Sequence, residues 1–167
     1  MGLGHQGDYN GWASYSSDAV FTNDSWQSSI MSYFSQSENT SINASYAYIS
    51  TFMPVDWIAL GDLYQDQGYS ISTAFSGNTI YGFNTNISSS KSYIFSNFIE
   101  LIDSTAFTIV DGSGTDTLDL SGFTNDNVID LRPTQKNSTN LYASDIAGDI
   151  GNLVFGPGTI IENCIGG

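Results

Sequence analysis

The sequence predicts an α+β fold, with one helix in the first part of the chain and short strands in the second. Three observations support this class. Residues 52–64 show helical spacing with a proline near the start, which is typical of a helix N-terminus. Aromatic and β-branched runs then alternate with turn residues, and residues 111–122 concentrate aspartate and glycine. With 167 residues, 40% of them hydrophobic, the chain is long enough for one ordinary domain or two small ones.

The chain is strongly acidic, with 17 Asp and Glu residues against three Lys and Arg, which gives a formal net charge of −14. Because it lacks a basic patch that could replace phosphate counterions, nucleic acid is excluded as a partner. Bound cations would relieve the repulsion among so many carboxylates. The single cysteine, Cys164, rules out an internal disulfide framework, and no apolar run is long enough for a membrane span.

The first part of the chain is mostly polar and without helical period, which predicts loops over residues 1–24 and 39–51. His5, the only histidine, follows two glycines that let the chain turn sharply. Residues 29–35, Ser-Ile-Met-Ser-Tyr-Phe-Ser, predict a compact turn that carries Met31 beside Tyr33. Taken alone, Met31 could equally fill a gap in the core.

Residues 52–64 predict the helix. Pro54 suits the first helical position, where no amide proton is needed, and Asp56 suits the positive end of the helix dipole. Gly68 is the expected stop, so we place a boundary near residues 68–72, between units 1–69 and 70–167. Residues at helical spacing that we expect to pack inward are Trp57, Leu60, Gly61 and Tyr64.

Four runs in the second unit predict short strands: residues 79–83, 92–95, 107–110 and 128–131. Each run is rich in β-branched or aromatic residues, with Gly, Asn, Ser and Asp between the runs. Strands this short need a shared sheet or a metal to persist. We therefore expect an all-β second unit.

Residues 111–119 place three carboxylates, Asp111, Asp116 and Asp119, around two glycines. Calcium takes six to eight oxygen ligands, and a tight glycine-rich turn supplies main-chain carbonyls between the carboxylates. The segment thus predicts a calcium-binding loop. The alternative is an ordinary Asp/Gly turn before a strand.

The sequence also resembles the serralysin family, the secreted bacterial zinc proteases of the metzincin group. The metzincin signature is H-E-x-x-H-x-x-G-x-x-H followed by a Met-turn, and residues 2–5 match its last four positions. The resemblance implies that His5 binds zinc, that Met31 lies beneath the metal in the Met-turn, and that Tyr33 is a further zinc ligand or transition-state partner. Unit 1–69 would then be the C-terminal part of a metzincin catalytic domain that closes with the helix ending in Leu-Tyr.

The first two histidines and the glutamate general base of that signature are absent from the chain. We expect them upstream of Met1. Hydrolytic zinc needs three protein ligands, an open position for water and a general base. This polypeptide is therefore not expected to hold catalytic zinc or to be active by itself.

The resemblance extends to the serralysin C-terminal domain, whose glycine-rich repeats form a calcium-filled parallel β-roll. Unit 70–167 would be the start of that domain, truncated at the first repeat. In isolation, Thr79 and Glu162 would be ordinary surface residues, and Asn78 stands where serralysins commonly carry Asp. The implied ligands of a first calcium are Phe75, Gly77, Thr79, Asp111, Ser113 and Asp116. Those of a second are Gly114, Asp116, Glu162 and the main-chain carbonyl of Ile160.

The implied function is that of a secreted, extracellular zinc metalloendopeptidase, stabilised by calcium, that acts as a monomer on protein or peptide substrates. No N-terminal signal peptide is present, so this location rests on the family alone. The alternative is a non-catalytic, RTX-like calcium-binding β-roll with a structural or adhesive role. The protease is favoured because four signals occur in the family order: the G-x-x-H of residues 2–5, the Met-turn, the helix ending in Leu-Tyr and the calcium-binding loop. A serine hydrolase is excluded, because the chain has no G-x-S-x-G nucleophile motif.

Overall fold

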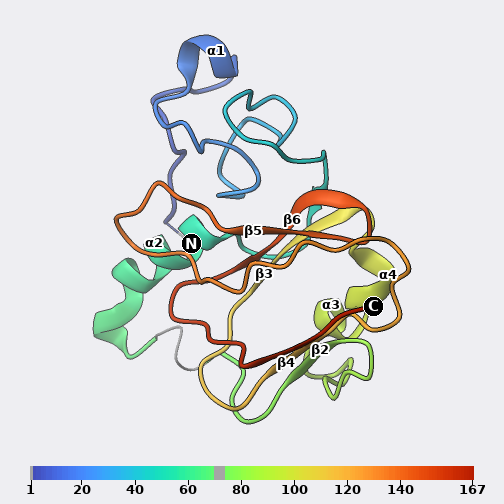
Figure 1. Cartoon of the computed structure of the whole chain (residues 1–167). Helices are drawn as coiled ribbons and strands as arrows, with labels where there is room; N and C mark the ends of the chain where they lie inside the picture. Colours follow the sequence, from blue (N-terminus) through green and yellow to red (C-terminus); the bar gives the residue numbers. More distant parts are fainter. Residues whose placement is uncertain (1, 70–73) are drawn as a thin grey trace.

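The computed structural model describes residues 2–69 and 74–167 and mixes helices with strands, as an α+β class predicts (Figure 1). No helix in these residues has the length and apolarity needed to cross a membrane. The helices are α1 (Tyr15–Asp18), α2 (Pro54–Tyr64), the 3-10 helix η1 (Gln65–Gln67), α3 (Tyr93–Ser96) and α4 (Phe98–Leu101). The strands are β1 (Tyr48–Ile49), β2 (Ile80–Gly82), β3 (Thr105–Ile109), β4 (Thr117–Asp119), β5 (Ala143–Ile146), β6 (Asp149–Phe155) and β7 (Asn163–Ile165).

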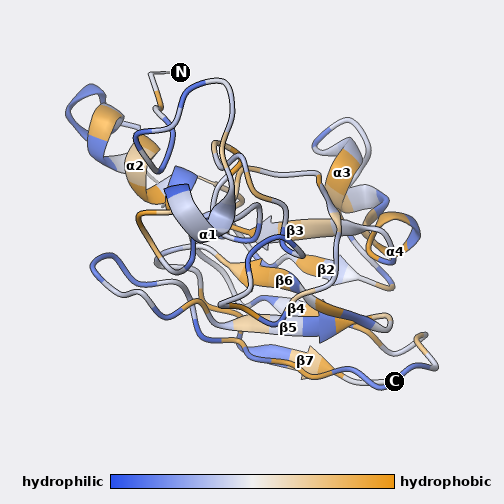
Figure 2. Ribbon diagram, turned by 90° about the horizontal axis from the view of Figure 1, so that it is seen from above, coloured by the Kyte–Doolittle hydropathy of each residue, from blue (hydrophilic) through white to orange (hydrophobic). Residues whose placement is uncertain are grey.

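Two sheets form the body of the molecule. The larger sheet has the order β1-β3-β6-β5, in which only the β5–β6 pair is antiparallel. The smaller sheet has the order β2-β4-β7 and is parallel, with Ile80 opposite Thr117 and Thr117 opposite Asn163. Figure 2 shows hydrophobic residues along β6, which agrees with the burial of every residue from 151 to 155. The strands at the centre of the larger sheet thus form part of the core.

The main core joins both sheets to the short helices α3 and α4. The ring centroids of Phe98 and Phe107 lie 5.0 Å apart, and both side chains are almost fully buried. The ring centroids of Tyr81 in β2 and Phe95 in α3 lie 5.5 Å apart. Residues 111–116, the first part of the predicted calcium-binding segment, therefore extend from a tightly packed body. We call these residues the candidate calcium loop.

The strand predicted at residues 92–95 is wrong, because Tyr93–Ser96 is the helix α3. The Ser92 hydroxyl accepts a hydrogen bond from the Phe95 amide at 3.3 Å, which caps the helix N-terminus. The helical turn also places Phe95 in the aromatic core. Capping and packing therefore override the β-propensity of Tyr, Ile and Phe, and the expected all-β unit instead contains α3 and α4.

The predicted strands at 79–83 and 107–110 are confirmed by β2 and β3. The strand predicted at 128–131 is wrong, because only Val128 forms a bridge there, to Asp145, and its side chain is 60% exposed. Strands β1, β4, β5, β6 and β7 were not predicted, and both β1 and α1 lie in segments that were predicted to be loops. Each of these strands pairs with a strand of the same sheet, so tertiary pairing gives these less distinctive sequences their extended geometry.

The predicted helix is confirmed by α2, which begins at Pro54. The chain turns at Gly68, whose φ is +81°, after η1. The most deeply buried residues lie instead at the start of the helix, where Met53 and Asp56 are 1% and 2% exposed. The residues predicted to face inward are only partly buried: Trp57, Leu60, Gly61 and Tyr64.

Strand β1 connects the first part of the chain to the larger sheet. It pairs in parallel with β3, and the Tyr48 amide donates to the Ser104 carbonyl at 3.0 Å. A second, smaller core packs Ala47 and Met53 against Ala106 and Val154. Residues 70–73 of the predicted boundary lie outside the described residues, and the division into two units stays a prediction.

Candidate functional site

His5, Met31 and Tyr33 come together in one cluster. The Nδ1 atom of His5 lies 3.0 Å from the Met31 carbonyl oxygen, and the His5 and Tyr33 rings meet edge to face at 4.5 Å. Because a carbonyl oxygen can only accept, this hydrogen bond places the proton of a neutral imidazole on Nδ1. The Nε2 lone pair of the exposed His5 is then available to a metal.

Helix α2 holds the turn at residues 29–32, which we call the Met31 turn. The Asp56 carboxylate accepts hydrogen bonds from the Ser29 hydroxyl at 2.6 Å and from the Ile30 and Met53 amides at 2.9 Å each. The Ser29 hydroxyl in turn accepts from the Met31 amide at 3.0 Å. The sequence argument assigned Asp56 only to the helix dipole and missed this connection between α2 and the Met31 turn.

A mostly apolar groove of about 560 Å³ lies beside this cluster. His5 and Met31 line one part of it, and Val55 and Ala59 of α2 line another. Residues 137–139 contribute from the long loop between β4 and β5. Segments far apart in the sequence thus form a concave surface next to His5.

The candidate calcium loop, residues 111–116, packs against residues 75–79. The Gly77 amide donates to the Ser113 carbonyl at 2.8 Å, and the Thr79 amide donates to the Asp116 carboxylate at 2.7 Å. The fold therefore brings together all six predicted ligands of the first calcium: Phe75, Gly77, Thr79, Asp111, Ser113 and Asp116.

Asp111 and Asp116 are buried, with exposed fractions of 2% and 1%. Burial raises the pKa of Asp116, and the charges of Asp111 and Glu162 raise it further, although the Thr79 amide opposes this change. The Tyr81 hydroxyl donates to Asp111 at 2.6 Å. Buried carboxylates that repel each other favour a bound cation or a proton between them.

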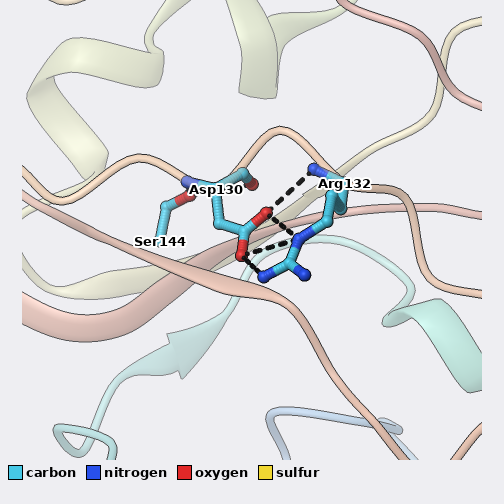
Figure 3. Close-up of polar contacts among 3 residues, drawn as sticks. All are labelled: Asp130, Arg132 and Ser144. Carbon is cyan, nitrogen blue, oxygen red and sulfur yellow. Dashed lines mark hydrogen bonds and ion pairs between the residues drawn. The ribbon is translucent and has the colours of Figure 1, made fainter.

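The three bases of the chain contact groups other than the Asp111 and Asp116 carboxylates. Arg132 forms a bidentate ion pair with Asp130, as Figure 3 shows, and its guanidinium stacks on the Tyr142 ring at 3.9 Å. Lys136 pairs with Asp62 at 2.5 Å, and Lys91 lies 4.7 Å from the centre of the Phe75 ring. In the part of the chain that the structure describes, no base forms an ion pair with Asp111 or Asp116. This loop is thus suited to a metal cation.

The loop also approaches Glu162, a predicted ligand of the second calcium. The Asp116 amide donates to the Glu162 carboxylate at 2.7 Å. Gly114 has a φ of +147°, and a Cβ atom there would lie 2.4 Å from the Gly77 carbonyl oxygen, so glycine permits the close approach. Ile160 is 66% exposed and forms no hydrogen bond to this loop within the described residues.

No three His, Cys, Asp or Glu side chains form a metal-binding group within residues 2–69 and 74–167. The predicted ligand sets include two carboxylates each, Asp111 with Asp116 and Asp116 with Glu162, so an ion at either position would need main-chain and hydroxyl oxygens as well. The third carboxylate of the motif, Asp119, accepts from Asn84 at 2.8 Å and from the Ser121 amide at 3.0 Å. Burial raises its pKa, but these hydrogen bonds lower it more.

Comparison with known proteins gives consistent matches. The family model described as Peptidase M10 serralysin C terminal matches residues 71–167. The metalloprotease AprA of Pseudomonas entomophila is 38% identical over the whole chain, which covers 32% of that relative. Serralysin C of Dickeya chrysanthemi is 36% identical over the whole chain, again with 32% of the relative covered. The chain belongs to the peptidase M10 serralysin family.

The predicted resemblance to serralysins is thus confirmed. The chain spans about a third of the length of these curated relatives. The serralysin family model covers the segment with the candidate calcium loop, whereas the alignments with whole serralysins also include the segment with His5, Met31 and Tyr33. Both candidate sites therefore lie in regions of similarity to this family.

Proposed function

We propose that the chain forms part of a secreted, extracellular zinc metalloendopeptidase, stabilised by calcium, that hydrolyses peptide bonds in proteins. The observation that supports this proposal best is the cluster of His5, Met31 and Tyr33, in which the Met31 carbonyl binds Nδ1 of His5. Serralysin relatives that are metalloproteases by name align over the same residues. The complete enzyme would act as a monomer and would take an H-E-x-x-H segment from outside residues 1–167.

In this proposal the residues of the chain hold and orient groups at the reaction centre. Zinc, when bound, acts as a Lewis acid toward water and the substrate carbonyl. Nε2 of His5 would be one zinc ligand, with the His5 ring held in place by the Met31 carbonyl, and Met31 would belong to the Met-turn. The Tyr33 hydroxyl would coordinate zinc or donate a hydrogen bond to the oxyanion that develops during peptide hydrolysis. The general base would be the glutamate of the H-E-x-x-H segment.

We assign calcium to the loop at residues 111–116. Asp111 and Asp116 would supply the charged ligands of the first ion, with further oxygens from Ser113 and residues 75–79. Asp116 and Glu162 would hold the second, together with oxygens of Gly114 and Ile160. The parallel sheet β2-β4-β7 would then continue as a β-roll.

A non-catalytic calcium-binding module is the second candidate. One observation supports it: residues 111–116 are hydrogen-bonded to residues 75–79 and to Glu162, and these segments carry the candidate calcium ligands. The upstream coding sequence separates the two functions. An in-frame H-E-x-x-H supports the protease, and its absence supports the module.

A thermal melt of the chain tests the calcium assignment. We expect millimolar calcium to raise the melting temperature relative to chelator, because a ligand at 100 times its Kd stabilises the folded state by about 2.7 kcal/mol. Asp116→Asn should remove most of that shift, whereas Asp126→Asn, an exposed control, should retain it. Identical melting curves in calcium and chelator would contradict the assignment.

A polypeptide extended by an upstream H-E-x-x-H segment tests the protease. We expect zinc-dependent peptide hydrolysis, and a decrease in kcat of about 100-fold to 1000-fold in Tyr33→Phe with little change in KM. The exposed Tyr46→Phe variant is the control. Unchanged turnover would remove Tyr33 from the mechanism, and an inactive extended polypeptide would overturn the proposed enzyme.

A further inference from the structure

We propose that Tyr9 and Asp24 form a positioning pair that fixes the ring of Tyr33. This inference rests on the proposed function for the value of Tyr33 to catalysis. The positioning itself is a property of the described chain and can be tested without zinc.

Asp24 is fully buried and is held by hydroxyl groups. The Tyr9 hydroxyl lies 3.1 Å and 3.0 Å from its two carboxylate oxygens, and the Ser32 hydroxyl donates to one of them at 2.7 Å. The Asn39 side chain donates to the Asp24 carbonyl at 3.2 Å. A buried carboxylate is costly unless it is hydrogen-bonded, so Asp24 strongly favours one position of the Tyr9 hydroxyl.

Tyr9 passes this constraint to Tyr33 through its ring. Tyr9 is 7% exposed, and its ring centroid lies 4.7 Å from that of Tyr33 and 5.2 Å from that of Phe34. A Cβ atom on Gly7 would lie 2.6 Å from the Tyr9 ring, so a glycine there allows the ring to occupy this place. The anchored ring of Tyr9 thus forms one wall against Tyr33.

Among the residues that the structure describes, the Tyr33 side chain forms only one weak hydrogen bond and is otherwise positioned by neighbouring rings. It is partly exposed, and the Gly11 amide donates to its hydroxyl at a long 3.3 Å. The rings of Tyr9 and His5 pack against it, at 4.7 Å and 4.5 Å. Ser32, the residue before Tyr33, binds the same Asp24 carboxylate. Asp24 therefore constrains both the backbone before Tyr33 and the ring beside it.

The pair matters because a catalytic hydroxyl must be held close to its productive position. A displacement of about 1 Å can lower a rate about 100-fold. Tyr9→Phe keeps the ring and removes the hydrogen bonds to Asp24, whereas Tyr9→Leu also removes the aromatic contact. Tyr15→Phe is a matched control, since it removes a loop hydroxyl that donates to the Thr22 carbonyl rather than to Asp24.

The direct test is fluorine NMR of the chain with 3-fluorotyrosine at position 33. In the folded unsubstituted protein and in folded Tyr15→Phe, we expect the chemical shift of this resonance to be displaced from its value in the denatured chain. Tyr9→Leu should lose at least half of that displacement, and Tyr9→Phe a smaller part. Full displacement in a folded Tyr9→Leu variant would overturn the proposal. If Tyr9→Leu does not fold, an unchanged resonance in both Tyr9→Phe and Ser32→Ala would overturn it.

The extended polypeptide with H-E-x-x-H gives the second readout. Tyr9→Phe should lower kcat about 10-fold with KM within twofold, because it moves the Tyr33 hydroxyl without removing it. An inactive extended polypeptide would contradict the proposed function, while the resonance of position 33 would still decide the positioning role. If Tyr9→Phe changes the chemical shift of position 33 but leaves kcat unchanged, the pair has no value for catalysis and that part of the proposal is overturned.

Discussion

Asp56 is the residue whose loss should most directly separate α2 from the Met31 turn. Its carboxylate is 2% exposed and accepts hydrogen bonds from the Ser29 hydroxyl and from the Ile30 and Met53 amides. We predict that Asp56→Ala destabilises the chain strongly. The variant would leave three donors without an acceptor in a place that water reaches poorly.

The expected magnitude follows from these three contacts. An unsatisfied buried donor costs about 1–3 kcal/mol, and local relaxation recovers part of the sum, so we expect a loss of about 3–5 kcal/mol. Domains are stable by about 5–15 kcal/mol, so this loss is a large fraction of the total. Asp56→Asn retains one acceptor oxygen and should lose about 2 kcal/mol.

Urea unfolding followed by tryptophan fluorescence measures this loss. With an m value of about 2 kcal/mol/M, the midpoint for Asp56→Ala should fall by about 2 M, while m should not change. Asp66→Ala, which removes an exposed carboxylate from η1, is the control. A midpoint for Asp56→Ala no lower than that of Asp66→Ala would refute the reasoning. Hydrogen exchange should also show faster exchange at the Ile30 and Met53 amides.

Three further predictions concern the second part of the chain. Gly114→Ala should cost about 1–3 kcal/mol and weaken stabilisation by calcium, because its Cβ atom would meet the Gly77 carbonyl; melting with and without calcium measures both effects. Phe107→Ala, in the main core, should cost about 3–5 kcal/mol in urea unfolding. Asp130→Asn should cost about 0.5–1 kcal/mol near neutral pH, because the hydrogen bonds from Arg132 lower the pKa of Asp130.

The sign of the pH effect follows from that lowered pKa. The Asp130 pair stabilises the folded state above the unfolded pKa of about 3.9, and this stabilisation is lost as the pH falls through the lower folded value. The difference between Asp130→Asn and the unsubstituted chain should therefore be constant from about pH 7 to about pH 5 and should shrink as the pH falls below about 4. Asp126→Asn, at an exposed position, is the control. A difference independent of pH would contradict the assigned pair.

Different results would contradict the Gly114→Ala and Phe107→Ala predictions. Unchanged calcium stabilisation in Gly114→Ala would show that the approach of residues 77 and 114 is not needed by the ion. A Phe107→Ala loss below about 1 kcal/mol would mean that the core collapses around the cavity. Ser88→Ala, at an exposed loop position, is a matched control for both variants.

Local sequence determined several features of this protein. Pro54 and Gly68 bracket α2 and η1 because each residue restricts or permits particular backbone angles, which needs no tertiary partner. The β-branched run at 107–110 predicted the central strand β3. The resemblance to the serralysin signature and Met-turn also singled out His5, Met31 and Tyr33. The helix and strand signals depend on residues that are neighbours along the chain, whereas the signature match extends over residues 2–33.

Other features were decided only by tertiary structure. The segment at 92–95 has strand-forming residues but is helical, because Ser92 caps it and Phe95 fits the core. Apart from the Met53 amide, the donors to Asp24 and Asp56 lie 8 to 27 residues away, which no local pattern reveals. Contacts across long separations exist only once the chain has folded. The amino-acid sequence thus determined which residues could carry the chemistry, and the fold decided which of them meet.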